Sequence, residues 1–284
     1  MATKISKKIK QNTTYDDVKE VISVTGSIIS GSYPEPGVAG TNILNDTEGM
    51  YQTTHDFPHL SQSSIPAFDI TFGVRRNGEF ASDVVTGTAT DTQAKFNIHD
   101  QMAAIMLGYD QTGSVRVFDV SGNFNSVNAA SVMDAPVFID LSRVVTKDEI
   151  VKGGFELTID AEPWANPQTF ATRITITDSG SSDVEDGLRI LKETTNNTNV
   201  GILDRYRGVA AIQLSSSVVS TLFDDAGLNY FVSGAVDRSW DFEESVHSGT
   251  IVELATAMRH RIYNMQVTNV AQINEAVYTI TARS

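Results

Sequence analysis

Alternating apolar and polar residues recur along most of the chain and predict β-strands. The alternation is clearest at residues 66–74 (PAFDITFGV), 136–144 (PVFIDLSRV) and 154–161 (GFELTIDA), where β-branched and aromatic residues are frequent. Turn-forming residues separate these segments from one another. The predicted strands are residues 18–30, 66–74, 114–120, 136–144, 154–161, 170–177, 188–192, 200–203, 208–214 and 277–281.

Two segments instead repeat their apolar residues at helical spacing. Residues 92–107 predict a helix that starts at Asp91 or Thr92, stops at Gly108, and has an apolar face made of Ile98, Met102, Ile105, Met106 and Tyr109. A second helix is predicted to start at Thr250, because Thr250 and Glu253 have the spacing of a capping box. Residues 147–152 predict a single helical turn and residues 215–223 a short helix.

The first 64 residues have a different character. Residues 1–17 are polar and predict a flexible tail, and residues 31–64 contain Pro34, Pro36 and Pro58 together with several glycines. The second stretch is longer than an ordinary loop. It fits either an arm that lies on a neighbouring subunit or a poorly ordered insertion. We therefore expect an N-terminal arm and extended segment over residues 1–64, and a β-rich core domain with a C-terminal helix–strand element over residues 65–284.

These elements together predict the fold class. Most of the predicted elements are strands joined by short turns, which is typical of antiparallel sheets. The expected fold is mainly β (α+β), with an antiparallel β-sandwich-like core, two or three packed helices and an extended N-terminal arm.

Composition and charge narrow the possible partners. The chain of 284 residues has no cysteine and a net charge of −14. Four lysines, Lys4, Lys7, Lys8 and Lys10, lie in the first ten residues without an acid, so the remainder has 17 basic and 35 acidic residues and a net charge of −18. A body this acidic repels phosphate backbones, so nucleic acid is not expected as a partner. No apolar run is long enough to cross a bilayer, so no membrane partner is expected either.

The sequence lacks the common motifs of catalysis and cofactor binding. It has no phosphate-binding P-loop, no dinucleotide fingerprint and no nucleophile elbow. His55 and His59 have metal-ligand spacing only on a helix, which Pro58 disfavours. The acidic stretch 178–187 has oxygen ligands at close spacing, although not at EF-hand spacing, and fits either a calcium site or a solvated turn. We therefore expect no cofactor, no metal and no catalytic residue.

Candidate interface residues are aromatic or basic. Trp164 and Trp240 lie in loop-like surroundings, where tryptophan either anchors a protein interface or covers the edge of the core. The four leader lysines either dock on an acidic neighbour or form a solvated tail. The candidate interface residues are Lys4, Lys7, Lys8, Lys10, Tyr33, Trp164 and Trp240.

Several blocks of sequence resemble a group of virion structural proteins. The blocks are residues 101–122 (QMAAIMLGYDQTGSVRVFDVSG), 138–161 (FIDLSRVVTKDEIVKGGFELTIDA), 68–73 (FDITFG) and 200–218 (VGILDRYRGVAAIQLSSSV). Together they look like structural proteins of contractile-tailed, T-even-like bacteriophages of the marine type. The most specific part is KDEI-x-KG-x-FE at residues 147–156, and residues after about 225 do not follow the pattern.

This resemblance implies a virion component with no catalytic residues to transfer. We expect a non-enzymatic subunit of the tail, baseplate or neck, made in the host cytoplasm, which assembles with itself and with other virion proteins through extended arms and sheet edges. The alternative is a receptor- or carbohydrate-binding module on a capsid surface or fibre, with Trp164 and Trp240 as stacking platforms. A hydrolase that uses scattered carboxylates is a third hypothesis.

Overall fold

The computed structural model describes residues 9–25, 43–55, 66–81, 91–142, 149–160, 173–178, 180, 183–185, 187–214, 230–232, 236–238, 246 and 249–280. Strands dominate these residues. The strands are β1 (Ile9–Thr25), β2 (Ile43–Asn45), β3 (Gln52–His55), β4 (Pro66–Phe72), β5 (Pro136–Asp140), β6 (Glu149–Asp160), β7 (Arg173–Thr177), β8 (Asp183–Glu185), β9 (Leu188–Glu193), β10 (Asn199–Asp204), β11 (Val209–Gln213), β12 (Tyr230–Val232), β13 (Val236–Arg238) and β14 (Ile262–Ile280). The helices are α2 (Thr92–Met106) and α4 (Ile251–Arg261).

One antiparallel sheet of 12 strands contains nearly all of these strands, in the order β1-β14-β6-β7-β9-β10-β11-β5-β4-β3-β2, with β8 paired to β9. Strands β12 and β13 form a separate pair. The predicted mainly β, antiparallel fold is confirmed. The other twelve described strands form one continuous sheet, so the structure does not confirm the expected sandwich of stacked sheets. The expected division between residues 64 and 65 runs between β3 and β4, which are hydrogen-bonded neighbours.

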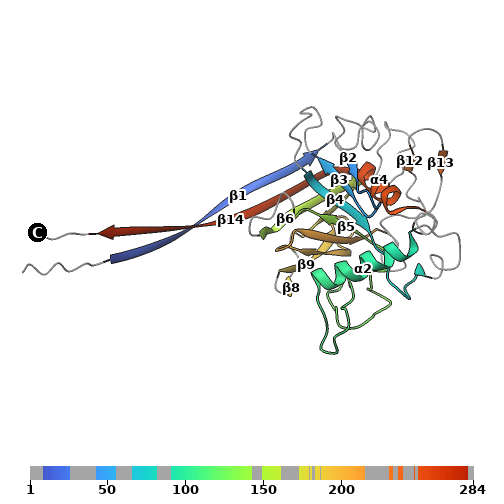
Figure 1. Cartoon of the computed structure of the whole chain (residues 1–284), viewed down its shortest axis with the longest axis horizontal. Helices are drawn as coiled ribbons and strands as arrows, with labels where there is room; N and C mark the ends of the chain where they lie inside the picture. Colours follow the sequence, from blue (N-terminus) through green and yellow to red (C-terminus); the bar gives the residue numbers. More distant parts are fainter. Residues whose placement is uncertain are drawn as a thin grey trace, which may run out of the picture.

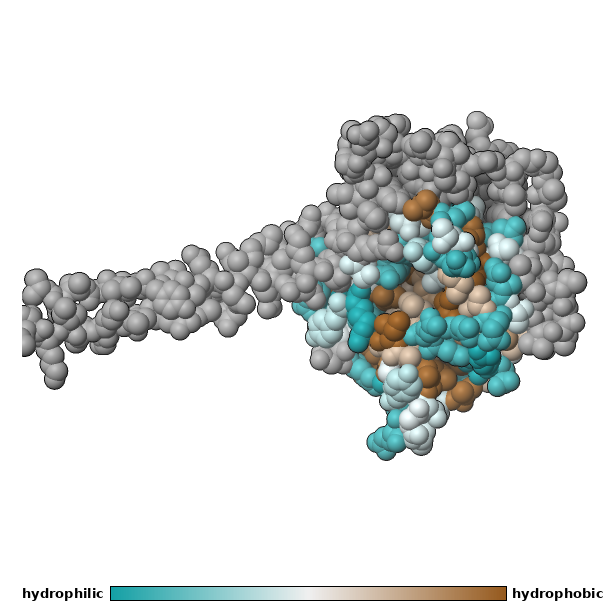
Figure 2. Space-filling model, in the orientation of Figure 1, coloured by the Kyte–Doolittle hydropathy of each residue, from teal (hydrophilic) through white to brown (hydrophobic). Residues whose placement is uncertain are grey.

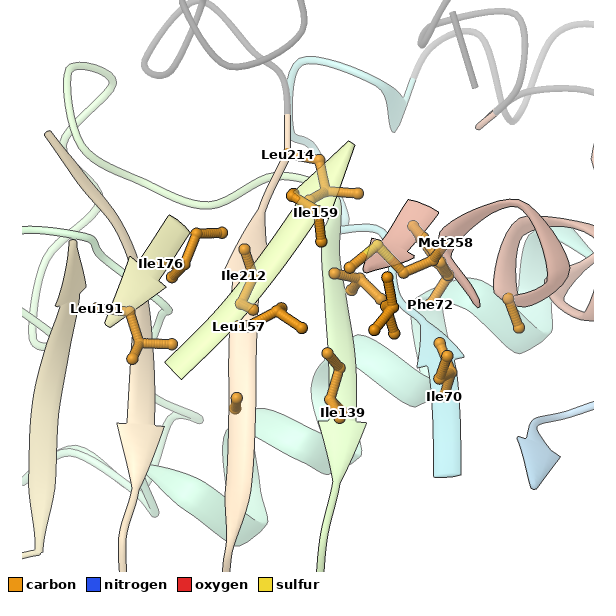
Figure 3. Close-up of a cluster of buried hydrophobic side chains, with 14 of the residues drawn as sticks. Ile70, Phe72, Ile139, Leu157, Ile159, Ile176, Leu191, Ile212, Leu214 and Met258 are labelled. Atoms are coloured by element: carbon orange, nitrogen blue, oxygen red, sulfur yellow. The ribbon is translucent and has the colours of Figure 1, made fainter. Parts of the chain in front are cut away.

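The sheet bends around a central hydrophobic core. Leu157 of β6 and Ile212 of β11 belong to the same buried cluster, although three strands separate β6 from β11 in the sheet. Figure 3 shows these side chains close together, with Ile139 of β5 and Ile176 of β7 beside them. A fully buried aliphatic side chain of this kind stabilises the fold by about 1.5–3 kcal/mol.

A second cluster covers the opposite face of the middle strands. All five residues of β11 are buried, and its four apolar residues alternate between the two clusters, with Ile212 in the first and Ala211 in the second. Helix α2 contributes Ile98, Ala103 and Met106 to the second cluster. Because successive strand residues point to opposite faces, the middle of the sheet is covered on both sides.

The helix predictions are confirmed in position, with one correction to the face of α2. Gly108 follows α2 with a positive φ of 77°, as a C-terminal stop requires.

The apolar face of α2 differs from the prediction. Ile105 and Tyr109, predicted on that face, are exposed instead. The buried residues of α2 are Lys95, Phe96, Ile98, His99, Ala103 and Met106. The buried face therefore differs from the predicted one, and most of its residues lie in the first half of the helix. Asp91 makes no side-chain cap to α2, and it accepts a hydrogen bond from Ile251 N of α4 instead (3.1 Å).

Two predictions between α2 and β6 are wrong. Residues 114–120 form no strand, because Asp110 and Asp119 hold tight turns: Asp110 accepts from Thr112 N and Ser114 N, and Asp119 accepts from Ser121 N. The single helical turn predicted at residues 147–152 is also wrong from Glu149 onward, since this segment is the start of β6 and pairs with β14. The short helix predicted at residues 215–223 lies outside the described residues.

The two terminal strands are longer than predicted, and they pair with each other. Strand β1 begins at Ile9, inside the segment expected to be flexible, and β14 extends from Ile262 to Ile280. All 17 residues of β1 are in register with β14, from Ile9 opposite Ile280 to Thr25 opposite Asn264. Strand β6 pairs with β14 only as far as Val270. The remainder of β1 and β14 therefore extends from the body as a two-stranded ribbon (Figure 1).

In the part of the chain that the structure describes, neither helix is long and apolar enough to span a membrane.

The N-terminal cap of α4 provides a test of local stability. The Thr250 side chain accepts from Glu253 N (3.1 Å), and the Glu253 carboxylate accepts from Thr250 N (2.8 Å). Replacing Thr250 with Ala removes the first bond and should lower the free energy of unfolding by about 1 kcal/mol in urea denaturation. Thr250→Ser retains a hydroxyl acceptor and is the control. Equal losses in the two variants would contradict a capping role.

Candidate functional sites

Most of the interface residues predicted from sequence lie outside the described residues. These are Lys4, Lys7, Lys8, Tyr33, Trp164 and Trp240. Lys10 lies within β1, at a register position opposite Thr279 of β14. The ribbon that β1 and β14 form is thus the candidate interface on which one predicted residue falls.

The ribbon has open main-chain edges. Among the described residues β1 pairs only with β14, so the other edge of β1 has no strand beside it. From Ala271 to Ile280, β14 has likewise only β1 as a partner. At a rise of about 3.4 Å per residue, β1 extends over about 55 Å. Unpaired N–H and C=O groups along such an edge are a template for another strand.

The acidic segment predicted as a calcium site or a turn is the centre of an ion-pair network. Asp178 is fully buried, and its carboxylate accepts from Gly153 N (2.8 Å), Phe155 N (3.0 Å) and Arg189 Nε (2.8 Å). The same guanidinium donates to Asp183 (2.6 Å), whose other oxygen pairs with Lys152. These bonds join β6, β8 and β9 around Asp178, the residue that follows β7.

A second ion pair continues the network onto the loop after α2. Arg116 donates through both terminal nitrogens to the Glu185 carboxylate, and also to the Leu107 carbonyl (3.0 Å). This bidentate contact lowers the pKa of Glu185 below its usual range and raises that of Arg116. Asp178, Asp183 and Glu185 are therefore each neutralised by an arginine or a lysine. No group of three or more His, Asp or Glu in the described part of the chain is placed to hold a metal ion.

Two of the sequence blocks described above, residues 138–161 and 200–218, contact each other in this region. Glu149, in the KDEI block, pairs with Arg205 of the GILDRYRG segment. Arg205 also donates to the Ile150 carbonyl (2.8 Å), and Ile150 N donates back to the Arg205 carbonyl (2.9 Å). The KG that follows is bound by Asp178 through Gly153 N. These two blocks thus contain residues that bond β6 to the turn after β10 and to the end of β7.

Among the described residues, His55 and His99 lie on separate elements. His55 lies in β3, whereas His59 and His247 are outside the described residues. His99 is buried in α2 with its ring edge against Phe118 (5.6 Å between centroids, 85° between planes). Its backbone also lies against Gly73, where a Cβ would collide with it. His99 therefore fills space between α2 and β4.

One buried charge, Lys95, was not predicted from the sequence, because no local pattern marks it. Its side chain is fully buried, and Nζ donates to the carbonyls of Val246 (2.7 Å) and Gly249 (2.6 Å), just before α4. Burial lowers the pKa of Lys95 to about 8, while Asp91 and Glu253 act against this shift. Together with the bond from Ile251 N to Asp91, this lysine fixes α4 to α2.

Three exposed apolar residues lie at or just after the end of α2. Ile105 is 52% exposed and Tyr109 is 62% exposed, and Tyr109 forms an isolated β-bridge with Val115, which is also exposed. On the face shown in Figure 2, however, apolar areas are small and separated by polar ones. Scattered apolar residues of this kind are normal on a protein surface.

Comparison of the chain with protein-family models, with curated proteins and with solved structures finds no match.

Removing the Asp178 carboxylate tests the ion-pair network. Asp178→Ala leaves the buried Arg189 with only the partly exposed Asp183 as a counter-charge and leaves two N–H groups without acceptors, so the free energy of unfolding should fall by about 3–5 kcal/mol. Asp183→Ala, at a carboxylate that is 38% exposed, is the matched control and should cost at most about 1 kcal/mol. Urea denaturation of both variants measures the difference. Similar losses would show that burial of Asp178 is not important.

The pKa of Lys95 predicts a pH dependence of stability. Because the folded-state pKa is about 8 and the unfolded value is 10.5, the unfolded chain holds more protons between these pH values. Stability contributed by Lys95 should therefore rise from about pH 8 to 10.5 and stay constant below pH 8. The measurement is urea denaturation across this range for the wild type and Lys95→Met. A free-energy difference between them that does not change with pH would contradict the shifted pKa.

Proposed function

We propose that this protein is a non-enzymatic structural subunit of a contractile-tailed phage particle, in its tail, baseplate or neck. The observation that carries the proposal is the β1/β14 ribbon. A two-stranded ribbon in water is marginally stable at best. The part of the ribbon beyond β6 therefore needs a third strand or another surface beside it, which a neighbouring subunit supplies in an assembly.

The chemistry of the ribbon suits this role. Main-chain hydrogen bonds to an added strand supply affinity without a pocket. The sheet from which the ribbon extends is covered on both faces of its middle strands, and the Arg189–Asp178 ion pair links neighbouring strands. It is therefore a stiff base. A stiff body with a long extension is typical of subunits that interlock.

The charged residues of the body support a structural role over a catalytic one. The buried acids Asp178, Asp134 and Asp204 are each bonded to an arginine. Asp119 is fully buried and accepts hydrogen bonds from the hydroxyl groups of Ser121 and Ser131. These carboxylates hold turns and strands together. The resemblance of the same segments to phage structural proteins points in the same direction.

The proposal predicts that the protein is a component of intact particles. Mass spectrometry of gradient-purified virions should detect it at a fixed ratio to the major tail protein. Gold-labelled antibody against the protein should mark the neck, tail or baseplate in negative-stain images, because a subunit there occupies one defined position. A replication protein of the same phage is the negative control. Absence of the protein from purified particles would contradict the proposal.

A further inference from the structure

The outer part of β1 has an open edge, a defined register and a self-complementary sequence. Its residues from Ile9 to Val18 pair with Ala271–Ile280, and in the described structure no third strand covers either edge there. We propose that the edge of β1 pairs antiparallel with β1 of a second copy of this chain, about a two-fold axis at Tyr15. This proposal rests on the assembly role proposed above and names the partner.

Symmetry restricts the possible registers. In an antiparallel ladder, directly opposite pairs alternate between a hydrogen-bonded and a non-hydrogen-bonded type. A two-fold axis maps each pair onto a pair of the same type, so it must pass midway between a residue and the copy of that residue directly opposite. Each register is therefore defined by the β1 residue at its centre.

Charge excludes the registers centred on charged residues. Asp16, Asp17, Lys19 or Glu20 at the centre would lie opposite its own copy, and like charges directly opposite destabilise a sheet. A centre at Val18 fails for the same reason, because it places Asp16 opposite Glu20.

A centre at Asn12 or earlier pairs at most residues Ile9 to Tyr15 of β1 and leaves Asp16 to Val18 without a third strand. The other neighbouring registers have mismatched pairs. A centre at Thr13 places Ile9 opposite Asp17, and a centre at Thr14 places Ile9 opposite Lys19. A centre at Val21 or beyond pairs at most Asp17 to Thr25 of β1, and from Lys19 onward the partner strand β14 is already supported by β6. That register leaves the outer ribbon without a third strand.

The register centred on Tyr15 has none of these mismatches. It places Lys10 opposite Glu20 of the second copy, and Glu20 opposite the second copy's Lys10, so that two opposite-charge pairs form. Ile9 lies opposite Val21 in the same way, and the two copies of Tyr15 meet at the axis. Aromatic, apolar and opposite-charge pairs across strands each stabilise a sheet. The acids Asp16 and Asp17 lie opposite threonines.

The resulting assembly is a four-stranded sheet in the order β14-β1-β1-β14, with the two bodies at opposite ends. Each outer ribbon then has the third strand that it lacks in one copy. Lys10, which the sequence singled out as an interface residue, is one of the paired charges. Because exposed ion pairs contribute little affinity, we expect main-chain hydrogen bonds to supply affinity and the charges to select the register.

Single cysteines test the register directly, since the chain has no cysteine of its own. Directly opposite Cα atoms lie about 4.5–5.5 Å apart, which suits a disulfide. Under mild oxidation of the full-length protein, Tyr15→Cys should form a covalent dimer in high yield. Thr13→Cys and Val21→Cys are the register controls, and Thr112→Cys, in the exposed loop after α2, measures random cross-linking. A maximum at Thr13 or Val21, or no excess of Tyr15→Cys over Thr112→Cys, would overturn the proposal.

Charge reversal tests the paired residues without a covalent bond. Light scattering should show the wild type at twice the chain mass of 30.8 kDa. Lys10→Glu or Glu20→Lys places like charges opposite each other and should raise the dimer dissociation constant, and the double variant should restore it. Lys19→Glu is the matched control, because Lys19 lies opposite the uncharged Gln11 in this register. A monomeric wild type, or a double variant as weak as the singles, would overturn the proposal.

These outcomes separate this inference from the proposed function. A protein that is monomeric and does not cross-link at Tyr15, yet is present in purified virions, would overturn the pairing of two copies and leave the structural role standing. A dimer cross-linked at Tyr15 in a protein absent from virions would do the opposite.

Discussion

The hydrogen-bonded ladder of β14 is the interaction on which the rest of the structure depends. This strand pairs with β1 on one edge and with β6 on the other, and α4 leads directly into it. It therefore connects the first strand of the chain to the body. Beyond Val270, within the described part of the chain, β14 pairs with β1 alone, and the same ladder continues as the two-stranded ribbon. The proposed assembly role follows from this change in the number of paired strands.

The body provides a rigid base for the ribbon because two of its buried charges, Asp178 and Lys95, are bonded internally. Asp178 binds two N–H groups of β6 at the bulge where β6 changes register against β14, and Arg189 neutralises it. Lys95 connects α2 to the segment before α4. In a low-dielectric interior a fully bonded network of this kind specifies one arrangement, since breaking any member leaves a charge buried.

Local signals in the sequence were sufficient for some elements of the fold and insufficient for others. The cap at Thr250 and the stop at Gly108 were predictable, because capping depends on residues a few positions apart. The strand at Glu149 was not, since its partner β14 lies more than a hundred residues later. The exposure of Ile105 depends on what packs against α2, which helical periodicity does not specify. Of the candidate site, the sequence indicated Lys10 but not the ribbon.

The sequence by itself determined the mainly β class, the two described helices and the acidic, cysteine-free composition, because strand alternation, caps and charge are local properties. Only the tertiary structure decided that residues near the two ends of the chain form one ribbon, that the acids of residues 178–185 bind arginine and lysine, and that Lys95 is buried. Each of these depends on which distant segments meet. That choice is made by burial of the common core and by main-chain pairing, and no short window of sequence contains it.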